Sequence, residues 1–309
     1  MIIKEYIKSV EKVGKYGITF LDDFLGGIRK SDFVLIGADT GVGKSTLAYQ
    51  IAYNNCINKN VHLFALEAEK YEPYAKRAYT YIANQYFNKR TLYKNITMSY
   101  RSFIEGKIDV ASFEPGLTKY MDSFYKLRIH YKGKEFTIDT LLSAINKIID
   151  SCDMIILDHI DYFDLISDKE NSEVTGILKA LRAVSMDTGT PIIMFSHIRK
   201  SQFKQTILPH KDDFMGTSNK TKITKTSILI SPDFNTCDYV TGEYGTYIQI
   251  PKDRAYGKTN LVARCVFDRH KNKYADAYEL HRINGGAPDD KVLTVNELPR
   301  WANNAKEVL

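Results

Sequence analysis

The sequence predicts an α/β protein in which a mainly parallel central sheet is flanked by helices, with antiparallel strands added near the C-terminus. Apolar runs typical of buried strands alternate with helix-like segments over most of the 309 residues, which is the pattern of a parallel sheet covered by helices. A glycine-rich loop lies where the first apolar run gives way to a helical pattern. Toward the C-terminus, strand-like runs follow one another with only turn residues between them, which favours antiparallel pairing.

Each expected element has a local signal. Buried apolar runs predict the parallel strands at 32–37, 61–66, 154–157 and 192–195. Apolar residues at helical spacing predict helices at 45–58, 72–86, 137–150 and 173–186, and Gly189 and Pro191 stop the last of these. Alternating runs predict the C-terminal strands at 226–230, 246–251, 261–267 and 275–282. A turn is expected at Pro232 and Asp233, between the first two.

Length and composition indicate one large domain in a cytosolic protein. The residue usage is typical of an AT-rich genome, and if that genome is viral we expect the protein in the host cytoplasm. We expect an N-terminal arm or linker helix at 1–15, one folded domain at 16–285 and a tail at 286–309. No run approaches the roughly 20 apolar residues that span a bilayer, so we expect no membrane contact. The cysteines form no C-x-x-C pair, and a net charge of +6 fits ordinary solubility.

The strongest motif is the glycine-rich loop, which fits a Walker A phosphate-binding loop between a strand and a helix. It departs from the strict pattern because Ala38 stands where glycine is expected. Lys44 would reach the β- and γ-phosphates of ATP and Ser45 would hold Mg²⁺, while backbone N–H groups surround the phosphates. The predicted nucleotide-binding residues are Gly37, Ala38, Asp39, Thr40, Gly41, Val42, Gly43, Lys44, Ser45 and Thr46.

Two carboxylates stand where ATP hydrolysis needs them. Asp158 follows a buried strand and is the predicted Walker B metal ligand, with Asp161 and Asp164 as alternatives. Glu67 ends the second strand and is the predicted catalytic base, with Glu69 as its rival two residues later.

Two further sites carry basic side chains at strand ends. His197 follows the strand at 192–195 and is the candidate γ-phosphate sensor, although a structural histidine is the alternative. The cations after it, Arg199, Lys200 and Lys204, are candidates for a DNA-facing loop. Lys252 and Arg254 would project to one side of an extended strand, a geometry that suits an arginine finger but also a solvated surface pair.

Taken in their order along the chain, these motifs resemble those of the C-terminal motor domain of DnaB-type replicative helicases. The resemblance covers residues 16–282. F-A-L-E at 64–67 is similar to the family's F-S-L-E, and I-L-D at 156–158 is similar to its I-D-Y. S-H-I-R at 196–199 is similar to S-Q-L-N-R, with histidine as in the phage primase–helicase branch. K-D-R at 252–254 is similar to K-x-R. The segments at 17–22, 26–27, 104–107 and 137–138 also resemble family segments.

The resemblance implies a RecA-like fold in which the strand that Glu67 follows lies beside the P-loop strand. It also implies a 5′→3′ translocase on single-stranded DNA, assembled as a homo-oligomeric ring that we expect to be a hexamer. Nucleotide would then lie between subunits, with Glu67 as the base, His197 as the sensor, and Lys252 and Arg254 reaching the adjacent subunit's nucleotide. A primase or a helicase loader is a candidate partner.

Two departures keep other functions open. Residues 213–218 match only the Gly-Ser core of the family's central DNA loop, with Lys220, Lys222 and Lys225 nearby as candidate phosphate contacts or solvated cations. Only about fifteen residues precede the motor, so the family's primase-interacting N-terminal domain is expected to be missing. The alternatives are a RecA- or KaiC-like ATPase that does not unwind DNA, and a nucleotide-binding scaffold or loader for helicases.

Overall fold

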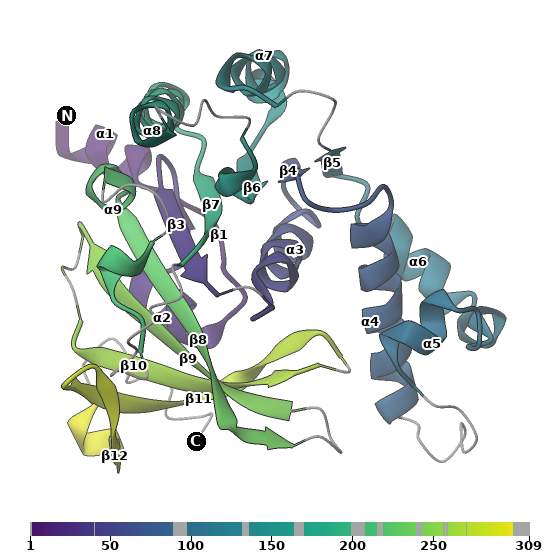
Figure 1. Cartoon of the computed structure of the whole chain (residues 1–309). Coiled ribbons are helices and arrows are strands. Elements are labelled where there is room, and N and C mark those ends of the chain that lie inside the picture. The colour runs from purple at the N-terminus through teal and green to yellow at the C-terminus, as the bar shows by residue number, and fades with distance from the viewer. Residues whose placement is uncertain are drawn as a thin grey trace.

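A computed structural model describes residues 2–39, 41–88, 98–131, 136–163, 170–198, 208–214, 219–238, 243–255, 257, 259–269 and 271–298. Within these residues the chain forms one large twisted sheet with helices on both faces, and a group of helices stands beside one end of the sheet (Figure 1). The bounds of the helices are α1 Ile2–Ser9, α2 Thr19–Leu25, α3 Lys44–Asn55, α4 Glu72–Asn88, α5 Tyr100–Ile104, α6 Gly116–Asp122, α7 Ile138–Ile148, α8 Glu170–Thr188 and α9 Asn219–Ile223.

The large sheet has the strand order β12-β11-β10-β9-β8-β3-β7-β6-β4-β5. Strands β8, β3, β7, β6, β4 and β5 are parallel, while β9 to β12 add in antiparallel fashion. The predicted fold class is therefore confirmed. The bounds of these strands are β3 Phe33–Ala38, β4 Val61–Ala65, β5 Leu127–Tyr131, β6 Met154–Asp158, β7 Ile192–His197, β8 Thr226–Asp238, β9 Glu243–Asp253, β10 Leu261–Asp268, β11 Lys273–Asn284 and β12 Ala287–Val292.

The two faces of the sheet bury separate cores. Because side chains alternate along a strand, Val34 and Ile36 of β3 pack with α2 and α3, while Phe33 and Leu35 pack with α7 and α8. A third cluster joins α4, α5 and α6, and Tyr79 is its most deeply buried aromatic residue. This layering holds the carboxyl ends of the parallel strands at one edge, where α/β proteins bind their ligands.

The order of the strands corrects one expectation. Strand β4, which precedes Glu67, does not lie beside the P-loop strand β3, because β7 and β6 pair between them. Crossover connections decide which parallel strands become neighbours, and the strand sequence alone does not reveal that order. Glu67 still comes to the same sheet edge as the P-loop.

The expected turn at Pro232 and Asp233 is also wrong. Strand β8 continues through both residues to Asp238 and pairs with β9 at Thr246 and Gly245. Its pairing with β3 ends at Ile230, so Pro232 lies where β8 has a partner on one side only. A proline without an N–H is tolerated at such an edge.

The remaining predicted strands and helices are present within a few residues of their expected bounds. No signal in the sequence predicts β5, and β12 continues the sheet beyond position 285, where a tail was expected. Near the start, β1 Lys12–Gly14 and β2 Ile28–Arg29 form a small separate sheet. None of the described helices combines the length and the apolar character that crossing a bilayer requires.

Candidate functional site

The P-loop connects β3 to α3 with a backbone that only glycine adopts readily. Gly41 and Gly43 have φ values of 79° and 95°, in the left-handed region. Gly43 is the N-cap of α3, and no side chain caps that helix end. The first N–H groups of α3 are therefore available to an anion, which the helix dipole also favours. Thr40, a predicted member of the loop, lies outside the described residues.

Lys44 folds back onto its own loop. Its Nζ donates to the carbonyl oxygens of Ala38 at 3.1 Å and Asp39 at 3.0 Å. It also lies 2.8 Å from Nδ1 of His197. Burial lowers the pKa of Lys44, although nearby carboxylates oppose the shift. The structure thus brings the predicted phosphate-binding lysine and the predicted sensor into direct contact.

Asp158 ends β6 beneath the P-loop and is almost completely buried. Burial raises its pKa to about 6, while a hydrogen bond from the Ser45 side chain acts in the opposite direction. Its Oδ1 accepts no hydrogen bond from any described residue. A buried oxygen without a partner, beside a serine hydroxyl, is a donor set that fits a hard cation such as Mg²⁺.

Glu67, His159 and His197 form a chain of close contacts at the same edge. His159 Nε2 lies 3.1 Å from Glu67 Oε2 and 3.1 Å from His197 Nε2. Glu67 is half-exposed, whereas the side chain of His159 is only 2% exposed. The rival Glu69 lies two residues further on in an exposed position, and its backbone N–H is held by Glu72. His159 was not predicted from the sequence, although its position directly after Asp158 at a strand end was a usable signal.

Asp161 is a second buried carboxylate, and it holds the sensor strand in place. Its Oδ2 accepts a 2.6 Å hydrogen bond from the backbone N–H of His197, and its Oδ1 lies 2.6 Å from Lys220 Nζ. Burial would raise the pKa of Asp161, but the contacts with His159, Lys220 and the His197 backbone together hold it well below its usual range. Asp161 is therefore engaged in the ion pair with Lys220, while Oδ1 of Asp158 remains able to bind a cation. Asp164, the other alternative, lies outside the described residues.

Two of the three lysines near the predicted DNA loop are not surface cations. Lys220 is 2% exposed and also donates to Ser196 Oγ at 3.0 Å. Lys225 makes an ion pair of 2.5 Å with Asp32. Of the three, Lys222 alone is exposed. The expectation of a phosphate-binding or solvated cation is therefore wrong for Lys220, because tertiary packing buries it against Asp161, while the partly exposed Lys225 is paired with the buried Asp32. Residues 215–218 and Arg199, Lys200 and Lys204 lie outside the described residues.

Lys252 and Arg254 project to the same side of the chain, and both bind α9. Lys252 Nζ donates to the carbonyl oxygens of Thr221, Lys222 and Thr224, and Arg254 Nη2 donates to that of Lys222 at 2.9 Å. Burial and the neighbouring cations lower the pKa of Lys252 to about 8. These contacts stabilise the carbonyl end of a short helix.

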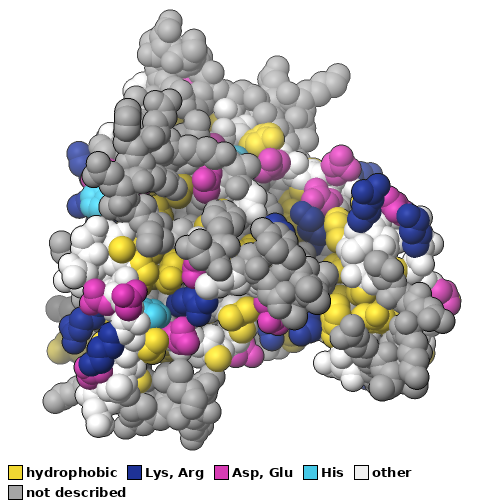
Figure 2. Space-filling model, turned by 60° about the horizontal axis from the view of Figure 1, so that its bottom comes forward, with side chains coloured by type: hydrophobic (Ala, Val, Ile, Leu, Met, Phe, Trp, Pro, Cys, Tyr) yellow, Lys and Arg dark blue, Asp and Glu magenta, His cyan; other side chains and the backbone are white. Residues whose placement is uncertain are grey.

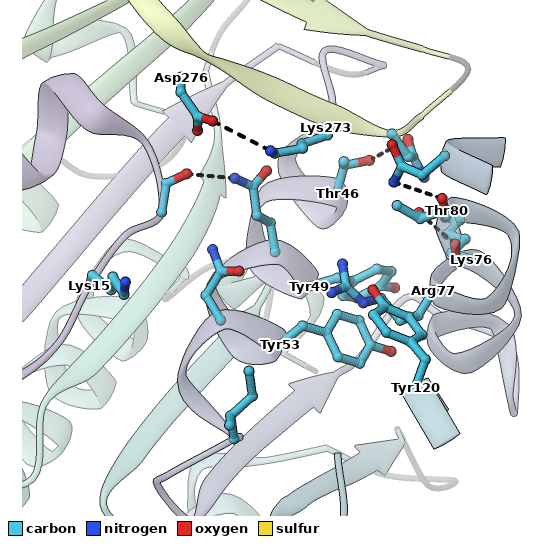
Figure 3. A pocket seen from close by; sticks show the side chains of 16 residues that line it. Lys15, Thr46, Tyr49, Tyr53, Lys76, Arg77, Thr80, Tyr120, Lys273 and Asp276 are labelled. Carbon is cyan, nitrogen blue, oxygen red and sulfur yellow. Dashed lines mark hydrogen bonds and ion pairs between the residues drawn. The ribbon is translucent and has the colours of Figure 1, made fainter. Parts of the chain in front are cut away.

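A cavity of about 460 Å³ begins at Thr46, directly after the P-loop, and follows α3. Figure 3 shows Tyr49 and Tyr53 of α3 gathered with Arg77 and Tyr120 on one side of it. The guanidinium of Arg77 lies 4.8 Å from the ring centres of both Tyr53 and Tyr120, which stabilises a buried cation. No local pattern in the sequence predicts this cavity, because its walls come from α3, α4, α6 and β11.

The charges on the face of the molecule drawn in Figure 2 are mixed. In Figure 2, the Lys and Arg side chains of the described residues are interspersed with Asp and Glu side chains. This distribution agrees with a modest net charge of +6.

Comparisons with known proteins match the chain to one family. The family model described as the DnaB-like helicase C terminal domain matches residues 15–275. A search of curated proteins finds no match.

Solved structures share the fold at low identity. A DnaB-like replicative helicase, solved in a study of its interactions with primase, has a TM-score of 0.68 and 18% identity, covering 89% of this chain and 65% of its own. A second structure, an ATPase domain, has a TM-score of 0.66 and 16% identity, covering 89% and 95%. A KaiC-like protein, PH0186 of Pyrococcus horikoshii OT3, has a TM-score of 0.55 and 16% identity, covering 86% and 98%. The fold is thus RecA-like, and the chain spans about two thirds of that replicative helicase.

Proposed function

Since the chain belongs to the DnaB-like helicase C-terminal domain family, we propose that it is an ATP-driven 5′→3′ translocase on single-stranded DNA. It works in DNA replication as a homo-oligomeric ring, a hexamer, with ATP hydrolysed at the subunit interfaces. The direction of movement and the ring are taken from the resemblance of its motifs. In this proposal, residues 1–15 are a linker arm, 16–285 are the motor, and 286–309 are a tail whose strand β12 extends the sheet of the motor. A primase or helicase loader is the expected partner.

The observation that carries the proposal is the convergence of Lys44, Asp158, Glu67 and His197 at one sheet edge. Lys44 contacts His197, and His197 connects through His159 to Glu67, in three contacts of 2.8 to 3.1 Å. Asp158 lies among them, with its unpartnered oxygen beside Ser45. Phosphoryl transfer needs this set of groups: a cation ligand, a phosphate-binding lysine, a base and a sensor.

Each residue has a defined task in the proposed mechanism. Bound Mg-ATP supplies the phosphoanhydride bond and the cation that neutralises its charge. Ser45 and Asp158 would hold the cation, and the ammonium of Lys44, which donates to the loop carbonyls in this structure, would bind the phosphates. Glu67 orients the attacking water and accepts its proton, and its exposure leaves that water accessible. His197 exchanges its contact with Lys44 for one with the γ-phosphate.

Lys252 and Arg254 act on the neighbouring subunit in this mechanism. They hold the end of α9, and Lys220 of α9 holds Asp161 beside His197. Helix α9 therefore connects Lys252 and Arg254, which act on the next subunit in this proposal, with His197, the sensor of their own subunit. The cavity that begins at Thr46 receives the sugar and base of the nucleotide, since it adjoins the P-loop and has the volume of a small-ligand pocket.

The test is ATP hydrolysis measured with and without single-stranded DNA, with particle size followed by light scattering. We expect DNA-stimulated turnover in a ring-sized particle. Arg254→Ala should lose the turnover by orders of magnitude while still binding Mg-ATP. The exposed Arg101, which pairs with Glu105 one helical turn away, gives the matched control Arg101→Ala, which should behave like the wild type. Turnover that ignores DNA, or that survives in Arg254→Ala, would refute the translocase.

A regulatory RecA- or KaiC-like ATPase is the second candidate. The ion pair of the buried Lys220 with Asp161 favours it, because this cation beside the predicted DNA loop is then unavailable to phosphates, and Lys225 is paired with Asp32. Ring-sized particles whose ATP hydrolysis does not respond to DNA would support this candidate.

A further inference from the structure

We propose that Glu67, His159 and His197 form a binding site for a transition-metal ion of the Zn²⁺ type, separate from the Mg²⁺ ligands Ser45 and Asp158. Occupation of this site would take Glu67 away from water and switch off hydrolysis. The site is an inhibitory one in the proposed ATPase, but the binding of metal does not depend on that activity.

The spacing of the three ligand atoms suits a small tetrahedral ion. Glu67, His159 and His197 each offer a ligand atom within 4.8 Å of the other two. His159 Nε2 lies 3.1 Å from Glu67 Oε2 and 3.1 Å from His197 Nε2. Zn–N bonds of 2.0–2.1 Å imply a separation of roughly 3.3 Å between ligands in a tetrahedron. Small side-chain rotations would therefore bring all three atoms to bonding distance. Glu67 is half-exposed, which leaves an entry path and an open fourth position.

The hydrogens on these groups cannot satisfy every contact at once. The ammonium of Lys44 only donates, so Nδ1 of His197 accepts and the ring proton of neutral His197 is on Nε2. That proton points at His159 Nε2, which must then accept. The same nitrogen cannot donate to the carboxylate of Glu67, 3.1 Å away. Two lone pairs face each other, and a cation between them removes the conflict.

His159 is already oriented as a ligand. Its ring is buried, and its Nδ1 faces Asp161 Oδ2 at 3.5 Å. Histidines that bind metals usually direct the other ring N–H at a carboxylate, which fixes the tautomer and makes the ligating nitrogen more basic. Two imidazole nitrogens with one carboxylate favour zinc or a similar ion, whereas Mg²⁺ prefers oxygen ligands alone. The two cation sites are therefore chemically distinct.

Lys44 competes with the metal. A metal on His197 Nε2 moves the ring proton to Nδ1, which would then face the ammonium of Lys44 as a second donor at 2.8 Å. Metal binding thus requires Lys44 to leave His197. Removal of the ammonium should consequently tighten metal binding.

The experiment titrates Co²⁺, and then Zn²⁺ by calorimetry, into the full chain without a polyhistidine tag, in excess Mg²⁺. One Co²⁺ per chain with the absorption bands of a tetrahedral complex is expected. His159→Gln should weaken binding by at least about tenfold, the smallest loss expected when a metal site is disturbed. Lys44→Ala should strengthen it. Thermal unfolding of each variant checks that it is folded.

The chain provides a matched control in a second histidine pair, His62 and His130, whose ring nitrogens lie 2.9 Å apart. No acidic, histidine or cysteine side chain among the described residues joins that pair in a three-ligand group. His130→Gln should therefore bind Co²⁺ like the wild type. The proposal is overturned if the wild type shows no tetrahedral bands, if folded His159→Gln binds unchanged, or if His130→Gln loses binding. Unchanged affinity in Lys44→Ala overturns the competition with Lys44. All these outcomes are readable even in a chain that does not hydrolyse ATP.

Discussion

Lys220 Nζ lies 2.6 Å from Asp161 Oδ1, and the side chain of Lys220 is buried. The pair joins α9, which follows the predicted DNA loop, to the segment after β6, whose Asp161 also holds the backbone of the sensor His197. A buried ion pair connects regions that are remote in sequence, so its loss should affect both folding and the site.

Lys220→Met is expected to lower the free energy of unfolding by about 3–5 kcal/mol, because it leaves the carboxylate of Asp161 buried without its cation. Urea unfolding would measure this. Lys222→Met, on the exposed side of the same helix, should change stability by less than about 0.5 kcal/mol. Adding Asp161→Asn to Lys220→Met should restore part of the loss. Equal effects of the two lysine substitutions would contradict the buried pair.

Gly37→Ala is expected to destabilise the protein by about 1–3 kcal/mol, because a Cβ there would lie 2.5 Å from Phe214 Cε1 and 3.0 Å from Ile198 Cγ2. Gly176, inside α8, has no atom within 4 Å of the corresponding position. Gly176→Ala should therefore stabilise by about 0.5–1 kcal/mol through helix propensity. Thermal unfolding of both variants measures these changes in stability. Unchanged stability in Gly37→Ala would show that the Phe214 side chain moves away from the added Cβ.

His62 should make stability fall as the solution becomes acidic. Burial, with His130 beside it, lowers the pKa of His62 from 6.5 to about 4. The unfolded chain therefore binds more protons between these values, so stability is full above pH 6.5 and declines as pH falls toward about 4. The loss is on the order of 3 kcal/mol. His62→Asn should flatten this part of the urea-unfolding profile, and an unchanged profile would exclude His62 as its cause.

Asp158→Asn is expected to stabilise the protein in EDTA near neutral pH. The pKa of Asp158 is raised from 3.8 to about 6, so its buried charge reduces stability as pH rises through that interval. Removing the charge should regain on the order of 1–3 kcal/mol without the cation. The variant should also lose the increase in Tm that Mg-ATP produces in the wild type. Destabilisation in EDTA would show that the carboxylate has a structural partner.

The sequence by itself determined the features whose signals are local. The Walker A loop, the strand before Asp158 and the alternation of strands and helices depend on residues close together in the chain, because glycine conformations and apolar periodicity act over a few residues. The fold class, the positions of Lys44 and Ser45 at the start of a helix, and the position of Asp158 at a strand end could therefore be predicted.

Only the tertiary structure decided which distant groups meet. It separated β4 from β3, carried β8 through Pro232, and placed His159 between Glu67 and His197. It also buried Lys220 against Asp161, although the lysine stands in a segment that looks solvated in the sequence. These outcomes depend on the order of the strands and on which carboxylates become buried away from water. Long-range contacts decide both, and no local pattern encodes them.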